Sequence, residues 1–320
     1  MTPAVNPRLI EHVAAYLAHA RALGHRYRQE EWLLRTLLRE LPALGHTDLG
    51  SDSVAVWFDR RRHLHANTRR KWAQQLRRFC LFRRRAEPDC FAPLPEFACR
   101  AQPYVMPVII EERQVASMLA AADALEPQLT SPSRPAAMRI AVVLLYTTGM
   151  RLGELQRLTL GDVEDSGAVL RVHESKFHKS RLLPLSASAQ AELLAYLERR
   201  CAAGFDAHPA APLLCTRARR STGAYSISGL QHALNSLLRG ACPAPRPRIH
   251  DLRHSFAVQA LARWYRQGAD VQAQLPKLAM YMGHASIEST AYYLRWTETI
   301  AGLASRRFEQ HFATAIGGRS

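Results

Sequence analysis

Apolar side chains recur at helical spacing through most of this chain. In the first part of the sequence this spacing predicts four helices, each with a polar outer face. The residues that mark them are Leu9, Val13 and Leu17; Trp32, Leu33, Leu37 and Leu38; Val54, Val56, Trp57 and Phe58 behind a cap at Ser51 or Ser53; and Trp72, Leu76 and Phe79 behind a cap at Asn67 or Thr68. The pattern is typical of a small helical bundle.

The later part of the chain mixes helices with short strands. Helical patterns cover 111–124, 138–148, 187–200, 226–238 and 252–265. Apolar residues cluster or alternate over strand lengths around 158–160, 169–172 and 181–185, with a polar tip over 174–180. The sequence therefore predicts a mostly α protein with a small antiparallel β-sheet, an α+β fold.

Prolines separate these two parts of the chain. They stand at positions 88, 93, 95, 103 and 107, and each proline removes a backbone donor and disfavours helix at the residue before it. We therefore expect a helical domain over 1–92, a linker over 93–106 and a second domain over 107–320.

The net charge of the chain indicates the kind of partner that it binds. The 320 residues include 43 Lys and Arg against 27 Asp and Glu, a formal net charge of +16. Such a surplus predicts a polyanion as the partner, with nucleic acid ahead of an anionic membrane surface. No apolar run approaches the about 20 residues of a membrane span, and the start shows no secretory signal. We expect a cytoplasmic protein with no membrane partner.

Much of this charge lies on the third and fourth predicted helices, in a run of almost one sign. A charged helix face is usually just solvated, but surfaces normally mix both signs. We therefore expect this face to contact DNA, and the candidate residues are Arg60, Arg61, Arg62, Arg69, Arg70, Lys71, Arg77 and Arg78.

Several kinds of chemistry have no motif in this sequence. It contains no P-loop, no glycine-rich dinucleotide turn and no zinc-protease helix motif. The six cysteines form no CxxC pair and are expected to be reduced thiols. His250 and His254 have the spacing of metal ligands, but only Asp251 lies near them, so a zinc site is not expected. We therefore expect no metal and no cofactor.

Four segments carry residues suited to phosphate chemistry. Arg151 follows the Gly149 break at the start of a helix, where it could hold an anion or simply pair with Glu154. The other three segments are a basic turn with Lys176 and Lys179, the sequence HDLRH with His250 and Arg253, and a Gly-His pair with His284 that is followed nine residues later by Tyr293. Each segment alone is ordinary, but their order and combination are specific.

This combination resembles the tyrosine recombinase (phage integrase) family over about 139–300. Arg151 in TGMRLGEL matches the family's first catalytic arginine, Lys176 in SKFHKSRLLPL matches its hairpin lysine, and His284 matches its Gly-His histidine, with Met282 in place of a leucine. His250 and Arg253 match the HxxR pair, and Tyr293 matches the nucleophile. Tyr292 is the rival nucleophile, and Lys179 is the rival lysine, which more readily contacts the DNA backbone.

The resemblance implies a site-specific DNA recombinase with a helical core-binding (SAM-like) domain before its catalytic domain. A tyrosine would attack a DNA phosphate, displace the 5′-oxygen and leave a 3′-phosphotyrosyl link that can be rejoined without ATP or metal. Double-stranded DNA with recombination sites is the implied partner. A homo- or hetero-tetramer is implied on that DNA, coupled through the C-terminal tail, although this tail could equally pack on its own chain.

Two other functions remain open from the sequence. A type IB topoisomerase-like enzyme shares the arginine, lysine and tyrosine chemistry but relaxes DNA as a monomer. A DNA-binding regulator without catalysis would have a degenerate active site. The HxxR and Gly-His motifs and the tail after Tyr293 favour the recombinase over the topoisomerase, and the six filled catalytic positions argue against the regulator.

Overall fold

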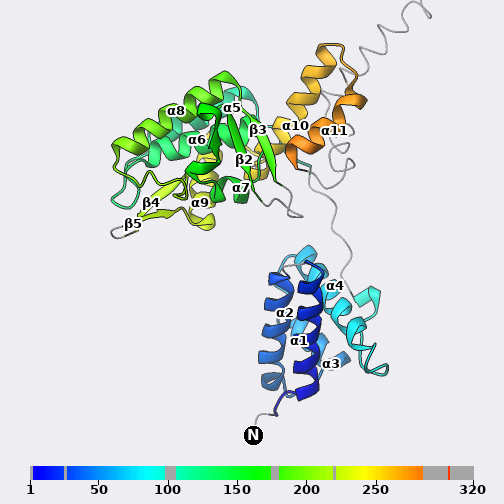
Figure 1. Ribbon diagram of the computed structural model, residues 1–320. Helices are drawn as coiled ribbons and strands as arrows, with labels where there is room; N and C mark the ends of the chain where they lie inside the picture. The colour runs from blue at the N-terminus through cyan, green and yellow to red at the C-terminus, as the bar shows by residue number, and fades with distance from the viewer. Residues whose placement is uncertain are drawn as a thin grey trace, which may run out of the picture. The chain divides into compact units, whose positions relative to one another are not determined.

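The chain divides into two compact units, residues 1–105 and 106–320 (Figure 1). The computed structural model describes residues 3–24, 27–97, 106–173, 180–218 and 221–283, together with Gly302. Among these residues helices dominate and the strands are few and short. The predicted α+β class, mostly α with small antiparallel sheets, is confirmed.

The first unit is built from the four expected helices. They are α1 (Pro7–Ala22), α2 (Arg28–Glu40), α3 (Ser51–Asp59) and α4 (Ala66–Arg83), with short 3-10 turns at Pro42–Leu44 and Pro95–Phe97. The cap of α4 differs from the prediction, since His65 accepts from the Asn67 amide at 3.2 Å. Leu9, Leu33, Trp57 and Phe79 are buried together, which confirms the apolar faces at these positions, whereas Trp32 and Val56 are exposed.

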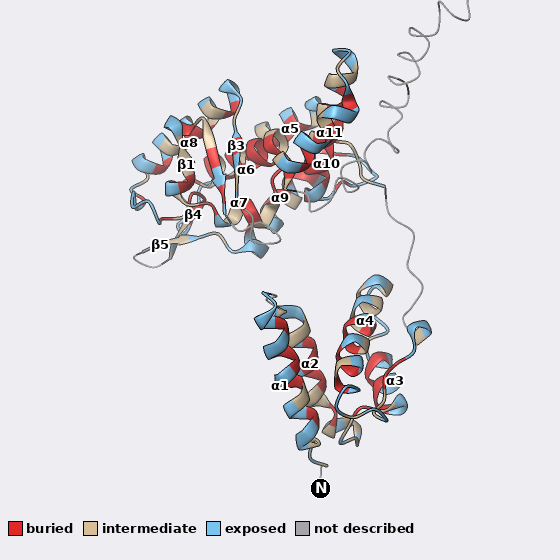
Figure 2. Ribbon diagram, turned by 45° about the vertical axis from the view of Figure 1, so that its right-hand side comes forward, coloured by how far each residue is buried: buried red, intermediate tan, exposed pale blue. Residues whose placement is uncertain are grey.

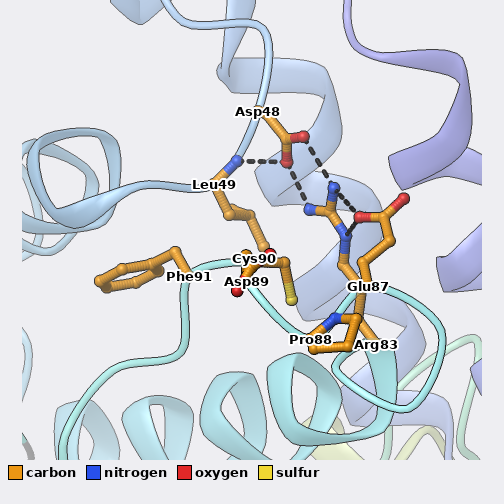
Figure 3. Close-up of a pocket in the computed structure, with 8 residues that line it drawn as sticks. All are labelled: Asp48, Leu49, Arg83, Glu87, Pro88, Asp89, Cys90 and Phe91. Atoms are coloured by element: carbon orange, nitrogen blue, oxygen red, sulfur yellow. Dashed lines mark hydrogen bonds and ion pairs between the residues drawn. The ribbon is translucent and has the colours of Figure 1, made fainter.

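A buried arginine closes this bundle from the end of α4. The guanidinium of Arg83 lies between the carboxylates of Asp48 and Glu87, as Figure 3 shows, at 2.5 Å and 2.6 Å. Burial alone would raise the pKa of Asp48, but hydrogen bonds from Arg83, Leu49 and Asn6 lower it. The ion pairs therefore join the turn before α3 to the segment after α4.

The second unit contains the remaining elements. They are α5 (Glu112–Asp123), α6 (Arg134–Thr148), α7 (Leu152–Arg157), β1 (Val163–Glu164), β2 (Val169–Val172), β3 (Arg181–Pro184), α8 (Ala187–Ala202), β4 (Cys215–Ala218), β5 (Ser221–Ala224), α9 (Ile227–Ala241), α10 (Ile249–Arg266) and α11 (Val271–Met282), with 3-10 turns at Leu160–Asp162 and Asp165–Gly167. Strands β1, β2 and β3 form an antiparallel sheet in which Leu170 faces Leu183.

Helix α6 is the centre of this unit because it is apolar on nearly all sides. It packs against α5, α7, α8, α9 and α10, and most of its residues are buried (Figure 2). Its end is fixed by Gly149, whose φ of +61° favours glycine. A Cβ there would also lie 2.5 Å from the Phe256 ring of α10. The chain therefore turns sharply at Gly149 and delivers Arg151 to the start of α7.

One predicted strand is wrong. Around 158–160 the chain enters the 3-10 turn Leu160–Asp162 instead, and the first strand follows at Val163–Glu164. Asp162 accepts from the amide and the hydroxyl of Thr159 at 2.8 Å and 2.9 Å, so the side chain closes the turn. The hairpin of β4 and β5 was not predicted from the sequence.

The Arg83 ion pairs predict a large loss of stability in Arg83→Met. Removing one partner leaves the carboxylates of Asp48 and Glu87 without their cation, which costs about 3 kcal/mol of unfolding free energy. Urea denaturation of the full chain measures this value. Arg62→Met is the control, because Arg62 pairs with Asp59 on an exposed surface and should lose at most about 0.5 kcal/mol. Equal losses in both variants would contradict the assigned role of Arg83.

Candidate active site

Three guanidinium groups converge on the C-terminal end of α11. They come from three separate elements and bind three successive backbone carbonyls. The pairs are Arg181 Nε with Tyr281 O at 2.8 Å, Arg253 Nη2 with Met282 O at 2.7 Å, and Arg151 Nη2 with Gly283 O at 3.0 Å. The last carbonyls of a helix lack helical partners and carry partial negative charge. This helix end therefore gathers the start of α7, β3 and α10 at one point.

Arg151 is held in place at the N-terminus of α7. Its amide donates to Glu154 Oε2 at 2.9 Å, and its Nη1 donates to Glu154 Oε1 at 2.8 Å. The pairing with Glu154 that the sequence left open is thus present. It is not a surface pair, however, because the Glu154 side chain is only 2% exposed while that of Arg151 is 29% exposed.

Glu154 serves two arginines with one carboxylate. Arg181 Nη2 donates to Glu154 Oε2 at 2.8 Å, and Arg181 Nη1 donates to Glu154 Oε1 at 3.3 Å. Burial alone would raise the pKa of Glu154, but Arg181 and Arg151 lower it to about 2. The carboxylate is therefore ionised, and the three side chains together carry one net positive charge.

Arg253 lies on the buried face of α10 and is 2% exposed. Its Nη1 donates to Gly149 O at 2.5 Å and its Nη2 to Met282 O at 2.7 Å. These bonds fix the guanidinium plane between the end of α6 and the end of α11. Since Arg151 binds the adjacent carbonyl of Gly283, the two predicted catalytic arginines lie side by side.

His250 stands in the first turn of α10, which begins three residues earlier than the pattern predicted. The residue is exposed overall, but its ring packs edge-on against His254, with 4.7 Å between the ring centroids. Partial burial of the ring, followed by the positive charges of Arg253 and Arg151, lowers the pKa of His250. A neutral imidazole beside two guanidinium groups can accept a proton while the cations hold an anion.

The start of α10 is itself secured by polar contacts. Asp251 accepts from the Arg248 amide at 2.7 Å and caps the helix. Ser255 donates to Asp251 O at 2.8 Å and accepts from the Ile110 amide at 2.7 Å. These bonds fix the first turn of α10, and with it the position of His250.

The other predicted catalytic residues lie outside the described part of the chain. They are Lys176, His284 and Tyr293, together with the rivals Lys179 and Tyr292. In the sequence, His284 directly follows Gly283, and Lys176 precedes Arg181 by five residues. Both neighbours belong to the cluster at the end of α11.

The predicted DNA-contacting residues of the first unit differ in their surroundings. The guanidinium of Arg61 makes contacts inside the unit. Its Nη2 lies 2.5 Å from Glu40 Oε2, and its Cζ lies 3.7 Å from the centroid of the Trp57 ring. The exposed ones are Arg60, Arg62, Lys71 and Arg78; those of intermediate exposure are Arg61, Arg69, Arg70 and Arg77. Among these, Arg62 pairs with Asp59, Lys71 donates to Gln29, Arg77 donates to Pro93 O, and Arg78 lies 3.9 Å from Glu30.

Residues in both units have surroundings that the sequence pattern did not predict. The pattern places Trp32 on the apolar face of α2, but its side chain is 53% exposed, and its ring lies tilted against that of Trp72 with 5.4 Å between the centroids. Arg28 and Arg35 are exposed on the same helix. In the second unit, the motif matches give Arg181 no role. The sequence offered one signal for each: the cations spaced about Trp32, and the arginine within SKFHKSRLLPL.

Within the described ranges, no three His, Cys, Asp or Glu side chains are grouped as metal ligands. A search of the same residues finds no helix that is long and apolar enough to cross a bilayer.

Comparison with known proteins assigns the family. The model of the phage integrase family matches residues 109–299. The putative integrase/recombinase y4rB of Sinorhizobium fredii is 33% identical over 316 residues, which cover 94% of this chain and 96% of the relative. Tyrosine recombinase XerC of Bacillus subtilis is 31% identical over 170 residues, 52% of each chain.

Solved structures show the same fold. The Tn1549 transposon integrase in complex with circular intermediate DNA matches with a TM-score of 0.62 at 17% identity, covering 94% of this chain and 99% of that one. A lambda integrase dimer bound to a core site matches with a TM-score of 0.57 at 17% identity, covering 91% and 98%. With the family model spanning more than half of the sequence, this chain belongs to the phage integrase family of tyrosine-type site-specific DNA recombinases.

Proposed function

We propose that Arg151, His250 and Arg253 form the phosphate-binding side of the catalytic centre of this recombinase. The observation that carries the proposal is the placement of both arginines on adjacent carbonyls at the end of α11. Guanidinium groups hold phosphate oxygens through paired N–H donors, and their value is greatest when they are fixed before the reaction. Arg151 and Arg253 would stabilise the negative charge that develops on the non-bridging oxygens.

The remaining roles follow from the sequence matches. The hydroxyl oxygen of Tyr293 would attack the phosphorus, a new O–P bond would form, and the bond from phosphorus to the 5′-oxygen would break. His250 would take the tyrosine proton, Lys176 would supply a proton to the leaving oxygen, and His284 would donate to the phosphate. Because the phosphodiester energy is kept in the tyrosyl link, the reverse steps rejoin a strand without ATP.

The comparisons support recombination and give no support to topoisomerase-like relaxation or to a regulator without catalysis. Double-stranded DNA is the partner that the family implies. We further propose that a homo- or hetero-tetramer assembles on paired sites through the C-terminal tail, in the cytoplasm. The DNA-bound dimer of lambda integrase is consistent with a two-copy half of that assembly.

In the first unit we propose that the DNA-facing surface combines the exposed residues of α2 and α4. Gln29 and Glu30 of α2 contact Lys71 and Gln75 of α4, so these helices lie next to each other. Lys71, Arg78, Arg28 and Arg35 supply exposed cations, with Trp32 among them. Such a surface suits phosphate contacts around a groove.

Covalent trapping tests the nucleophile. Nicked duplexes from the DNA that flanks the gene, incubated in EDTA without ATP, should yield a protein–DNA adduct that survives a denaturing gel. Tyr293→Phe should abolish the adduct, because the phenolic oxygen forms the link, and Tyr292→Phe should retain it. Loss only in Tyr292→Phe would move the nucleophile by one residue. Tight binding of these duplexes with no adduct would argue against catalysis.

The lowered pKa of His250 predicts the acid side of the pH profile. The neutral imidazole is the base, so cleavage should stay level from about pH 8 down to the ordinary histidine pKa of 6.5, and should fall only below it. The rate of adduct formation in a single turnover measures this profile, and His250→Asn should be slow at every pH. A fall that begins above pH 6.5 would contradict His250 as the base.

Salt dependence tests the DNA-facing surface. Lys71→Gln and Arg78→Gln should each weaken binding to site DNA and reduce the slope of log affinity against log salt by about 1, since each removes about one phosphate contact. Arg61→Met is the matched control, because its guanidinium is paired with Glu40, and it should leave the slope unchanged. A slope that changes only in Arg61→Met would reverse the assignment of the surface.

A further inference from the structure

Arg181 is the third guanidinium at the end of α11, and neither the motif set nor the proposed chemistry gives it a role. It is the first residue of β3, and its side chain is only 9% exposed. Three hydrogen bonds hold it, two to the carboxylate of Glu154 and one to Tyr281 O. These contacts span 27 and 100 residues of sequence, so Arg181 joins β3 to both α7 and α11.

The guanidinium of Arg181 lies directly against Gly283. A Cβ at residue 283 would come within 2.7 Å of Arg181 Nη1 and 3.0 Å of its Cζ. A free arginine could swing aside, but this one is fixed by Glu154 and Tyr281. Gly283 also has a φ of +67°, which already favours glycine. Both the lack of space and the backbone conformation therefore require glycine at position 283. The lack of space is due to Arg181.

Arg181 also determines how Glu154 acts on Arg151. One carboxylate shared by two arginines leaves one net positive charge in the trio. Without Arg181, Glu154 would be balanced by Arg151 alone, and the remaining pair would be neutral. A neutral pair would stabilise the charge that develops on a phosphate less well than the cationic trio does.

We infer that Arg181 is a positioning residue of the strand-transfer reaction, which holds the end of α11 against β3 and keeps Arg151 available to phosphate by sharing Glu154. This inference rests on the proposed function of Arg151. In the sequence Arg181 stands five residues after Lys176, and Gly283 stands directly before His284. Arg181 thus lies just after the segment that contains Lys176, and it contacts Gly283, which lies just before His284.

The rate of cleavage and the affinity for DNA separate this role from a purely structural one. Arg181→Gln should lower the single-turnover rate of adduct formation at saturating DNA by about 100-fold, the scale of a misplaced catalytic group. Its affinity for the same DNA should change by less than about 3-fold, because the phosphate-contacting surface remains. Arg181→Lys keeps the charge but not the three bonds, so it should recover part of the rate.

Arg139→Gln is the matched control. Arg139 of α6 also joins two carboxylates, those of Asp123 and Glu192, with N–O distances of 2.6 Å for each. It should lose stability but keep its cleavage rate per folded molecule. If Arg139→Gln and Arg181→Gln lose rate equally, or if Arg181→Gln cleaves as the wild type does, the positioning role is wrong.

A double-mutant cycle tests the contact with Gly283 without relying on activity. Gly283→Ala should lower the urea midpoint of unfolding strongly in the wild type and less in an Arg181→Ala background, where the clash is gone and only the backbone strain remains. Equal shifts in both backgrounds would overturn the inference. A wild type that forms no Tyr293-dependent adduct would instead refute the proposed function, while this cycle would still decide the Arg181–Gly283 contact.

Discussion

The end of α11 is the constraint on which the catalytic unit depends. Three successive carbonyls there need donors, and the chain supplies them as guanidinium groups from α7, β3 and α10. Each arginine satisfies part of its own donor set at the same time. The position of the helix end and the positions of the arginines therefore depend on each other, because neither can shift without breaking these hydrogen bonds.

Bringing three guanidinium groups together in a partly buried site costs free energy unless negative charges compensate them. Glu154 supplies a full negative charge and the helix end supplies a partial one. The compensation is incomplete, so the cluster stays positive overall. That remaining charge suits a phosphate, and partial burial together with the same positive charges lowers the pKa of His250. One arrangement thus suits both the proposed phosphate site and the proposed base.

The resemblance of short motifs proposes Arg151, His250 and Arg253 as catalytic residues, whereas local spacing predicted most of the helices, because apolar positions repeat within one turn of a helix. Local spacing failed where a distant contact decides. Nothing in the spacing shows that Arg181 reaches Tyr281, 100 residues away, or that Asp162 closes a turn where the apolar pattern predicted a strand. The pattern places Trp32 on the apolar face because it cannot show that this side chain packs against Trp72 and stays 53% exposed.

Counting arginines gives the sign of the partner but not the surface that meets it. In the first unit, Arg61 and Arg83 use their guanidinium groups inside the bundle, against Glu40 and against Asp48 with Glu87. A cation that is already paired and desolvated gains little from a phosphate, since it would first have to break its internal contacts. The charge that can attract DNA is therefore smaller than the composition suggests, and the exposed cations of α2 and α4 belong to the surface proposed for it.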